Sequence, residues 1–245
     1  MYNEFASCYD ALMQDVDYPA WAARCAALMG PGVKTVTECA CGTGNITIPL
    51  AKMGYRMTGV DLSGEMLQHA MEKARKEGLM IPFVCQDMTR LQVTRRQDAI
   101  LATCDGVNYL TDEAALKGFL TAAYQGLKPG GKLIFDVSSE YKLKNTLGNN
   151  TLTLDEEDAA YIWQNEWNEN KRTVTMYLSI FVRDAGQETF RRIREDQTQR
   201  AWSREELTDA LNACGYTGIT FYGGLEDRAP AADDTRLLVV AAKGE

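Results

Sequence analysis

The sequence predicts an α/β fold built on a parallel sheet, with a small antiparallel β subdomain inserted into it. Three observations support this prediction. Strand-like and amphipathic helical segments alternate along the first 139 residues, as in proteins whose strands are joined by helices. The first strand runs into the glycine-containing segment 36–44, Val-Thr-Glu-Cys-Ala-Cys-Gly-Thr-Gly. From 140 to 200 apolar and polar residues alternate, which is typical of antiparallel strands.

Composition and charge narrow the class of protein. The chain has 245 residues, 45% of them hydrophobic, enough for the core of one domain with an insertion. Its net charge of -8 argues against a broad basic surface for DNA or RNA. The N-terminus lacks a secretory pattern, and no apolar run approaches the ~18 residues of a membrane span. We therefore expect a cytoplasmic protein that acts on a small molecule, without a DNA or membrane partner.

The seven cysteines lie mostly in apolar segments, as reduced thiols in a protein core do. We expect them to be structural and expect no metal site.

The segment 36–44 predicts a ligand site at a tight turn from strand to helix, because glycine lets the backbone approach a ligand closely. A dinucleotide-binding fingerprint would need a third glycine after Gly42 and Gly44, but 45–47 is Asn-Ile-Thr. A phosphate-binding loop of the Walker type would need Gly-Lys-Ser/Thr, which is also missing. The segment therefore favours a nucleotide-like ligand without a polyphosphate.

The motif Glu38-x-Ala40-Cys41-Gly42-Thr43-Gly44 resembles the first motif of the class I S-adenosylmethionine-dependent methyltransferases. The resemblance implies a Rossmann-like seven-stranded methyltransferase sheet with helices on both faces, and S-adenosyl-L-methionine as cofactor. It also implies that Glu38, Ala40, Gly42 and Gly44 hold the amino-acid end of that cofactor. Many members have glycine where this chain has Ala40, so we expect a slightly tighter loop with binding intact.

The core elements follow in order along the chain. Spacing predicts a short helix with an aromatic stripe over 2–13 and a second helix that begins near Asp17, with Pro19 in its first turn. After the strand at about 33–39, Asn45 is the expected cap of the next helix. Further strands are expected at 56–61, 81–85, 98–104, 132–137, 216–222 and 236–242, and further helices at 63–77, 112–127 and 203–215. The core then has seven strands, as in the methyltransferases that the chain resembles.

Acidic residues follow two of the predicted strands. Asp61 stands at the carboxyl edge of the sheet, where ligands of open parallel sheets bind, and its carboxylate can accept both ribose hydroxyls. Its alternative role is to cap the next helix. The resemblance implies that Asp87 binds the adenine amine, with an ordinary turn aspartate as the alternative. The expected cofactor-binding set also includes their neighbours Leu62, Met66 and Met88.

The fourth strand ends at Cys104, and we expect the transferred methyl group at this edge. Cys104 is a further expected cofactor contact. Aromatic rings can stabilise a sulfonium charge, and Tyr2, Tyr9 and Tyr109 are the candidates, with core packing as the alternative. Asp105 is a possible proton acceptor. The expected catalytic residues are therefore Tyr9, Asp105 and Tyr109.

Methyl transfer from the expected cofactor does not require the protein to activate the methyl group. A sulfonium methyl is already activated by its charge, so the protein mainly aligns and desolvates the reactants. The only histidine, His69, is expected on a solvated helix face. An amine acceptor of depressed pKa needs no strong base, whereas a hydroxyl or carbon acceptor would, and Asp10 is a further possible proton acceptor.

The expected domain division places a cofactor-binding domain at 1–139 and 201–245, with the inserted β subdomain at 140–200 over the active site. Trp163, Trp167 and Arg191 are the candidate acceptor contacts, because exposed aromatics and arginine on an insertion often line a lid. Their alternative role is to pack the small sheet.

Three further segments sharpen the resemblance: Phe5-Ala-x-x-Tyr-Asp-x-Leu-Met13 with Tyr18-x-x-Trp21, Cys104-Asp-x-x-Asn-Tyr109, and Gln199-Arg-Ala-Trp-Ser203. They are similar to a bacterial subgroup of these enzymes called YqeM-like, and the similarity spans nearly the whole chain. Gln197 stands where that subgroup often has a histidine.

The leading hypothesis is a methyltransferase for a small-molecule acceptor whose reacting atom, N, O, C or S, stays open. One alternative is a methyltransferase of tRNA or ribosomes, suggested by the arginines at 191, 192 and 194. A second is a non-catalytic module that binds S-adenosylmethionine. A nicotinamide-dependent oxidoreductase is less favoured than either.

Overall fold

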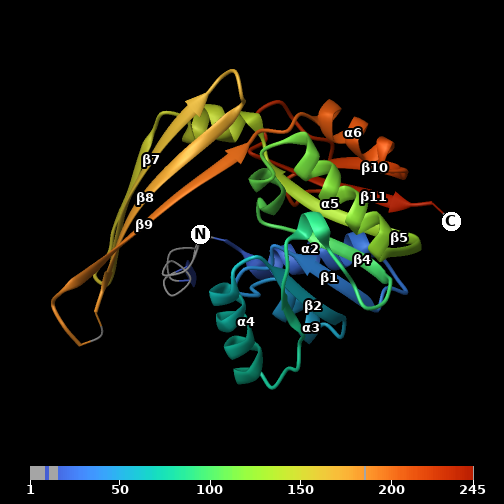
Figure 1. Cartoon of the computed structure of the whole chain (residues 1–245), viewed down its shortest axis with the longest axis horizontal. Coiled ribbons are helices and arrows are strands. Elements are labelled where there is room, and N and C mark those ends of the chain that lie inside the picture. The colour runs from blue at the N-terminus through green and yellow to red at the C-terminus, as the bar shows by residue number, and fades with distance from the viewer. Residues whose placement is uncertain (1–8, 11–15, 185, 245) are drawn as a thin grey trace.

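The computed structural model describes residues 9–10, 16–184 and 186–244. It confirms the predicted α/β class. A seven-stranded sheet forms the centre, and a separate four-stranded antiparallel sheet extends away from it (Figure 1). The helix predicted over 2–13 falls mostly outside the described residues, of which Tyr9 and Asp10 are helical.

The central sheet has the strand order β10-β11-β5-β4-β1-β2-β3. Its strands are β1 (Thr35–Cys39), β2 (Arg56–Asp61), β3 (Phe83–Cys85), β4 (Gln97–Ala102), β5 (Leu127–Ser138), β10 (Tyr216–Gly223) and β11 (Arg236–Lys243). Strands β1 to β5 are parallel, and β10 and β11 add an antiparallel edge. Since β1 lies between β2 and β4, the carboxyl ends of these three strands meet at one edge, where open α/β sheets bind ligands.

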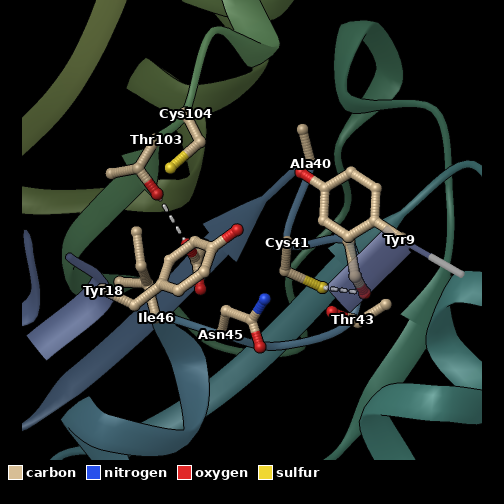
Figure 2. Close-up of a pocket in the computed structure, with 11 residues that line it drawn as sticks. Tyr9, Tyr18, Ala40, Cys41, Thr43, Asn45, Ile46, Thr103 and Cys104 are labelled. Atoms are coloured by element: carbon tan, nitrogen blue, oxygen red, sulfur yellow. Dashed lines mark hydrogen bonds between the residues drawn. The ribbon is translucent and has the colours of Figure 1, made fainter. Parts of the chain in front are cut away.

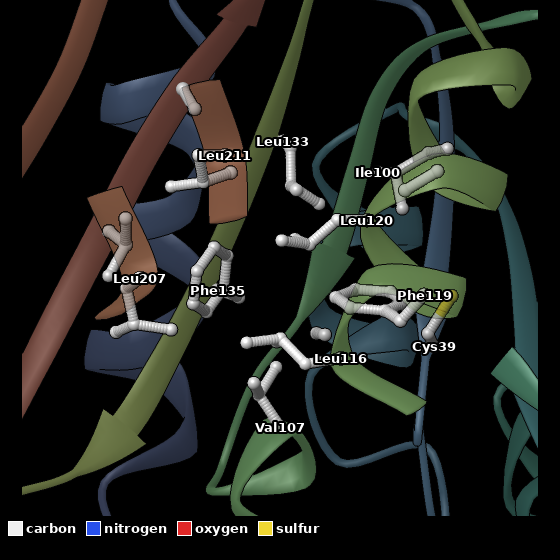
Figure 3. Close-up of a cluster of buried hydrophobic side chains, with 14 of the residues drawn as sticks. Cys39, Ile100, Val107, Leu116, Phe119, Leu120, Leu133, Phe135, Leu207 and Leu211 are labelled. Atoms are coloured by element: carbon white, nitrogen blue, oxygen red, sulfur yellow. The ribbon is translucent and has the colours of Figure 1, made fainter. Parts of the chain in front are cut away.

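Helices cover both faces of this sheet, as predicted. The helical elements are α2 (Tyr18–Met29), α3 (Thr47–Lys52), α4 (Gly64–Lys76), η1 (Met88–Arg90), η2 (Gly106–Tyr109), α5 (Glu113–Gly126), η3 (Tyr141–Leu147) and α6 (Arg204–Ala213). On one face, Trp21 of α2 and Leu50 of α3 pack against strand residues such as Ile134. On the other, Phe119 of α5 and Leu207 of α6 belong to a second buried cluster (Figure 3).

Three helix starts follow the sequence prediction. Asp17 and Asp112 each accept a hydrogen bond from the amide three residues later, at 2.9 and 2.8 Å. Ser203 and Glu206 form the capping box that opens α6. Each such cap contributes about 1 kcal/mol of helix stability.

The predicted cap of α3 is wrong. The helix begins at Thr47, and Asn45 does not cap it. The Asn45 side chain instead donates to Asp10 Oδ1 at 2.9 Å and accepts from Lys73 Nζ at 2.5 Å. These partners from other elements hold the amide away from the helix start.

Strand β5 begins earlier than predicted. Leu127 already pairs with Gln97 of β4, and after an irregularity in the register Lys132 pairs with Ala99. The Lys-Pro-Gly-Gly segment at 128–131 therefore lies within β5, whereas the predicted strand begins only at 132.

The second sheet has the order β6-β7-β8-β9 and is antiparallel throughout. Its strands are β6 (Thr151–Asp155), β7 (Ala159–Asn168), β8 (Thr173–Arg183) and β9 (Phe190–Arg200). Residues 169–172 form the turn between β7 and β8. Element η3 and strand β6 were not predicted. Strand β6 is short, and three of its five residues are exposed. One face of this sheet packs against η3 and against Met66 of α4 in a third hydrophobic cluster.

Charged groups fasten the second sheet to the core. Arg172, between β7 and β8, donates to Glu140 at 2.6 Å and to Glu206 of α6 at 2.9 Å. Glu206 also accepts from Arg200 at 2.8 Å. These bonds fix the base of the small sheet beside the carboxyl ends of β4 and β5.

Candidate active site

The loop after β1 places every second residue in the left-handed backbone region. Ala40, Gly42 and Gly44 have φ angles of 51°, 52° and 79°. Glycine adopts this region readily, whereas a residue with a Cβ there carries a penalty of roughly 1–2 kcal/mol. The predicted tight turn is therefore present, and Ala40 is a strained position within it.

Ala40 faces a glycine in the turn that follows β4. A Cβ added to Gly106, the first residue of η2, would come within 2.8 Å of the Cβ of Ala40. Ala40 is tolerated here because residue 106 has no side chain. The turn after β1 and the turn after β4 thus pack directly against each other.

Asp61 joins the end of β2 to the glycine loop. Its Oδ2 accepts a hydrogen bond from the Gly42 amide at 2.8 Å, and its Oδ1 accepts from the Ser63 amide at 2.9 Å. Ser63, rather than Asp61, caps α4 through the amide of Met66. Burial raises the pKa of Asp61, although these backbone bonds oppose the shift. Each carboxylate oxygen has a second lone pair for a further donor.

Glu38 is the buried carboxylate of the site, with 2% of its surface exposed. One oxygen accepts from the Thr47 hydroxyl, and the other accepts from the Thr103 hydroxyl at 2.7 Å. Burial raises its pKa to about 7, the charge of Asp61 adds to the shift, and the two hydroxyls oppose it. Glu38 therefore ties the start of α3 and the end of β4 to β1.

A pocket opens at this edge of the sheet (Figure 2). Its lining combines one carboxylate, two phenols and the loop backbone, and includes no lysine or arginine. The lining residues are Tyr9, Tyr18, Glu38, Ala40, Cys41, Gly42, Thr43, Asn45, Ile46, Thr103 and Cys104. This set of groups suits the cationic amino acid and sulfonium of S-adenosylmethionine, and suits a polyphosphate poorly.

The structure brings several predicted residues to this pocket. Five of them line it: Tyr9, Glu38, Ala40, Gly42 and Cys104. Tyr2 lies outside the described residues. Gly44 lies between the lining residues Thr43 and Asn45 but does not line the pocket itself, and a Cβ on it would meet Ala70 at 3.2 Å, so it serves close packing against α4.

The residues predicted for the adenosine end lie along the neighbouring strand ends and do not line the pocket. Leu62 is 68% exposed, an unusual position for leucine. Met66 is buried in the third cluster, and Met88 packs against the α5 side of the core. Asp87 accepts from the Thr89 amide at 2.8 Å and caps η1, which is the turn role considered as its alternative. Its side chain remains exposed.

Some residues that line the pocket were not predicted from the sequence. Tyr18, at the start of α2, lines the pocket. Thr103 lines it as well and donates a hydrogen bond to Glu38. Tyr18 is part of the Tyr18-x-x-Trp21 pattern, and Thr103 directly precedes Cys104, so both had a usable signal in the sequence.

The end of β4 carries an ion cluster. Asp105 pairs with Arg236 of β11, and Lys142 Nζ lies 3.8 Å from its second oxygen. Burial alone would raise the pKa of Asp105, but the charges of Arg236 and Lys142 outweigh it and lower the pKa. Asp136 shares Arg236 and is fully buried, which raises its pKa. Asp105 is therefore an ion-paired carboxylate with reduced basicity.

The other expected proton acceptors are also engaged. Asp10 accepts from Lys73 and Thr43, both at 2.6 Å, as well as from Asn45. Burial would raise the pKa of Asp10, but these hydrogen bonds lower it. Burial raises the pKa of Tyr9, so its phenol is protonated at neutral pH.

The three acceptor candidates on the inserted sheet lie in different surroundings. Trp163 is partly buried, and its Nε1 has no hydrogen-bond partner within the described ranges. Trp167 Nε1 donates to Glu169 at 2.6 Å near the base of the sheet. Arg191 is exposed near the far end of β9, six residues and roughly 20 Å from Gln197. Of the three, Trp163 has an open donor beside the core.

Within the described residues, no group of three or more histidine, cysteine, aspartate or glutamate side chains is arranged to hold a metal ion. Across the same residues, no helix has the length and apolar character needed to cross a bilayer.

Comparison with known proteins gives the family. Residues 36–131 match the family described as a methyltransferase domain. The chain is 33% identical over 246 residues to Bacillus subtilis YqeM, a protein named as a methyltransferase, and the match covers 100% of this chain and 98% of YqeM.

Solved structures agree. The crystal structure of an S-adenosylmethionine-dependent methyltransferase from Clostridium acetobutylicum has a TM-score of 0.90 and 33% identity, covering 100% of this chain and 99% of the other. The sugar N-methyltransferase KedS8 from Streptoalloteichus shares the fold, with a TM-score of 0.76, 22% identity, and coverage of 97% and 93%. The chain therefore belongs to the class I S-adenosylmethionine-dependent methyltransferases, within the group that includes YqeM.

Proposed function

We propose that this enzyme transfers the methyl group of S-adenosylmethionine to a small-molecule acceptor held between the glycine loop and the inserted sheet. The observation that carries the proposal is the convergence of Glu38, Asp61 and the left-handed loop around Gly42 at one sheet edge. Two carboxylates beside a loop of small residues match the cationic and ribose groups of the cofactor.

The cofactor would lie along this edge. Glu38 and the loop from Ala40 to Gly44 would hold the amino-acid end, and the remaining lone pairs of Asp61 would accept the ribose hydroxyls. The exposed Leu62 and Asp87 would contact adenine, with Met66 and Met88 behind them. Tyr2, Tyr9, Tyr109 and Cys104 would surround the sulfonium, where aromatic rings contribute roughly 0.5–2 kcal/mol.

The cofactor supplies an activated methyl group, so the residues of this chain align the acceptor and exclude water. Tyr9 is protonated and can donate a hydrogen bond to the acceptor or its surroundings. The ion pair with Arg236 lowers the pKa of Asp105, which makes it a positioning group in preference to a base. Such a site suits an amine that is already neutral when it reacts.

Two observations support a small acceptor. The net charge of -8 disfavours a polyanionic partner. Residues 191, 192 and 194, which suggested RNA, lie on the outer part of β9, where Arg192 donates to Ser179 at 2.7 Å and lies over the ring of Phe181. KedS8, named for a sugar acceptor, has the same fold, and by analogy a small polar amine is a reasonable substrate class.

The test is a transfer assay with methyl-labelled S-adenosylmethionine and a bacterial extract, with and without the enzyme. The extract is split into small-molecule, RNA and protein fractions, which are analysed by mass spectrometry. We expect enzyme-dependent label in the small-molecule fraction. Label that appears only in RNA, together with RNA retention that weakens steeply with salt, would instead support the alternative acceptor.

A further inference from the structure

The inserted sheet presents a buried glutamine to the end of β4. Gln197 lies near the end of β9, and 6% of its surface is exposed. It pairs in register with the buried Met176 of β8. Side chains alternate between the two faces of a strand, so Gln197 shares the buried face of β9 with Ile193 and Gln199. Gln197 therefore points to the core side of the sheet.

One end of the Gln197 amide is fixed by Tyr109. The phenol of Tyr109 donates a hydrogen bond to Gln197 Oε1 at 2.7 Å. Tyr109 ends η2, which is itself anchored because Asn108 Nδ2 donates to the carbonyls of Ser138 and Arg200 at 3.0 and 2.9 Å. The contact between Tyr109 and Gln197 is thus set by the packing of η2 against β5 and β9.

The other end of the amide has no hydrogen-bond partner among the described residues. Gln197 Nε2 is buried, and no described residue accepts a hydrogen bond from it. A buried donor left unpaired costs about 1–3 kcal/mol, and native proteins rarely retain one without a reason. Trp163 Nε1 is a second such donor. Trp163 pairs with Leu178 and Gln197 with Met176, two residues apart on β8, so both donors lie on the same face of the sheet.

Both donors lie close to groups that neighbour Tyr9, a residue that lines the pocket. Trp163 packs against the same hydrophobic cluster as Tyr9, which lines the pocket. Burial raises the pKa of Tyr9, and Tyr109 is among the groups close enough to add to that shift. Gln197 therefore bonds to a tyrosine that lies near Tyr9, and Trp163 shares a hydrophobic cluster with Tyr9.

We propose that Gln197 binds the methyl acceptor, donating from Nε2 to an uncharged oxygen of that acceptor while its Oε1 holds Tyr109. Trp163 Nε1 supplies a second donor. Two neutral N–H groups match hydroxyl or carbonyl oxygens, so the acceptor class is a hydroxylated or carbonyl-bearing amine. An apolar amine would leave both donors unpaired, and such a site rejects it. This inference rests on the proposed function, because it places the acceptor between the glycine loop and the inserted sheet.

The experiment compares a hydroxylated ring amine, glucosamine, with an apolar one, cyclohexylamine. Each is titrated by ligand-observed NMR into the enzyme saturated with S-adenosylhomocysteine. Gln197→Met removes both amide contacts, and Gln197→Glu keeps an acceptor for Tyr109 but removes the donor. Gln199→Met is the matched control, because Gln199 is a buried glutamine on the same face of the same strand. Thermal unfolding and S-adenosylhomocysteine affinity are measured for every variant.

The enzyme should bind glucosamine at least about 10-fold more tightly than cyclohexylamine. Both Gln197 variants should lose about 10-fold in glucosamine affinity, the effect of one unmade hydrogen bond, and Gln199→Met should lose none. The inference is overturned if the enzyme binds neither amine, if the Gln197 variants bind glucosamine normally, or if Gln199→Met loses as much. If S-adenosylhomocysteine binds normally in those cases, the proposed function still stands. If the wild-type enzyme does not bind S-adenosylhomocysteine, both this inference and the proposed function are overturned.

Discussion

Lys73 Nζ lies 2.6 Å from Asp10 Oδ2, an ion pair that joins α4 to the segment carrying Tyr9. The same ammonium donates to Thr43 at 2.9 Å and to Asn45 at 2.5 Å, both of which line the pocket. One cation thus holds the glycine loop and the neighbour of a pocket tyrosine in a fixed arrangement.

Replacing Lys73 by methionine should therefore weaken cofactor binding. The variant keeps the apolar stem but releases Asp10, and with it the position of Tyr9. Because the pair is partly exposed, we expect a modest loss of about 3- to 10-fold in S-adenosylmethionine affinity. The measurement is calorimetric titration. Lys76→Met, on the exposed side of the same helix, is the control. Equal losses in the two variants would mean that overall charge, and not the Lys73 contact, causes the effect.

Substitutions at Ala40 and Gly106 should have coupled effects on stability, because the two residues pack against each other. Gly106→Ala places a Cβ 2.8 Å from that of Ala40 and should lower the free energy of unfolding by about 1–3 kcal/mol. Ala40→Gly removes the opposing methyl and relieves the left-handed strain, so the double variant should recover most of the loss. Urea unfolding of the four proteins gives the coupling energy, expected at about 1–2 kcal/mol. Additive effects would contradict the close packing of the two turns.

Glu38 predicts a pH dependence of cofactor affinity. Its pKa is raised to about 7, so below pH 7 the carboxyl is mostly protonated and must release its proton to meet a cationic group. S-adenosylmethionine affinity should rise with pH, by up to about tenfold per unit between pH 5.5 and 7, and then level off. Calorimetry in buffers of different ionisation enthalpy should detect the released proton. Glu38→Gln should abolish both effects, and a wild-type affinity that is constant over this range would exclude the assignment.

Glu38 also determines the direction in which stability changes with pH. In the free enzyme Glu38 binds a proton more tightly when folded than when unfolded, where its pKa is 4.5. Its contribution to the free energy of unfolding therefore falls as pH rises from about 4.5 to 7 and is constant above that. Glutamine does not titrate, so the free energy of unfolding of Glu38→Gln should rise relative to that of the wild type as the pH rises over this interval.

The ion pairs of Arg172 should help to hold the inserted sheet against the core. Arg172→Met should release Glu140 and Glu206 and increase amide hydrogen exchange in η3 and at the β7–β8 turn. Lys52→Met, which breaks an exposed ion pair with Glu77 between α3 and the end of α4, is the control and should leave exchange in these segments unchanged. Unaltered exchange in Arg172→Met would show that apolar packing alone holds the sheet.

Much of the core could be predicted because its determinants are local. The strand-turn-helix at Gly42, the caps at Asp17, Asp112 and Ser203, and the alternation in β7 and β8 each depend on residues near in sequence. The predicted sheet edge followed from that local pattern, whereas the five predicted lining residues came from the resemblance to the methyltransferases and from the chemistry of the sulfonium that it implies.

The remaining features depend on partners far apart in sequence. Asn45 was assigned to a helix cap because nothing local reveals that Asp10 and Lys73 reach it. The basicity expected of Asp105 is reduced by Arg236, 131 residues away. Likewise, Tyr109 meets Gln197 only after the inserted sheet folds back beside β5. Sequence patterns place such residues on elements but do not show which elements meet.

The central claim is that S-adenosylmethionine binds at the edge between Gly42 and Asp61. Calorimetric titration of the cofactor into wild type, Asp61→Ala and Asp98→Ala tests it most directly. Asp98 also accepts backbone amides, from Lys34 and Thr35, but at the opposite end of the parallel strands. Loss of two charge-assisted hydrogen bonds predicts at least about 100-fold weaker binding in Asp61→Ala, with wild-type affinity in Asp98→Ala. Equal affinity in all three proteins, or no binding by wild type, would contradict the account.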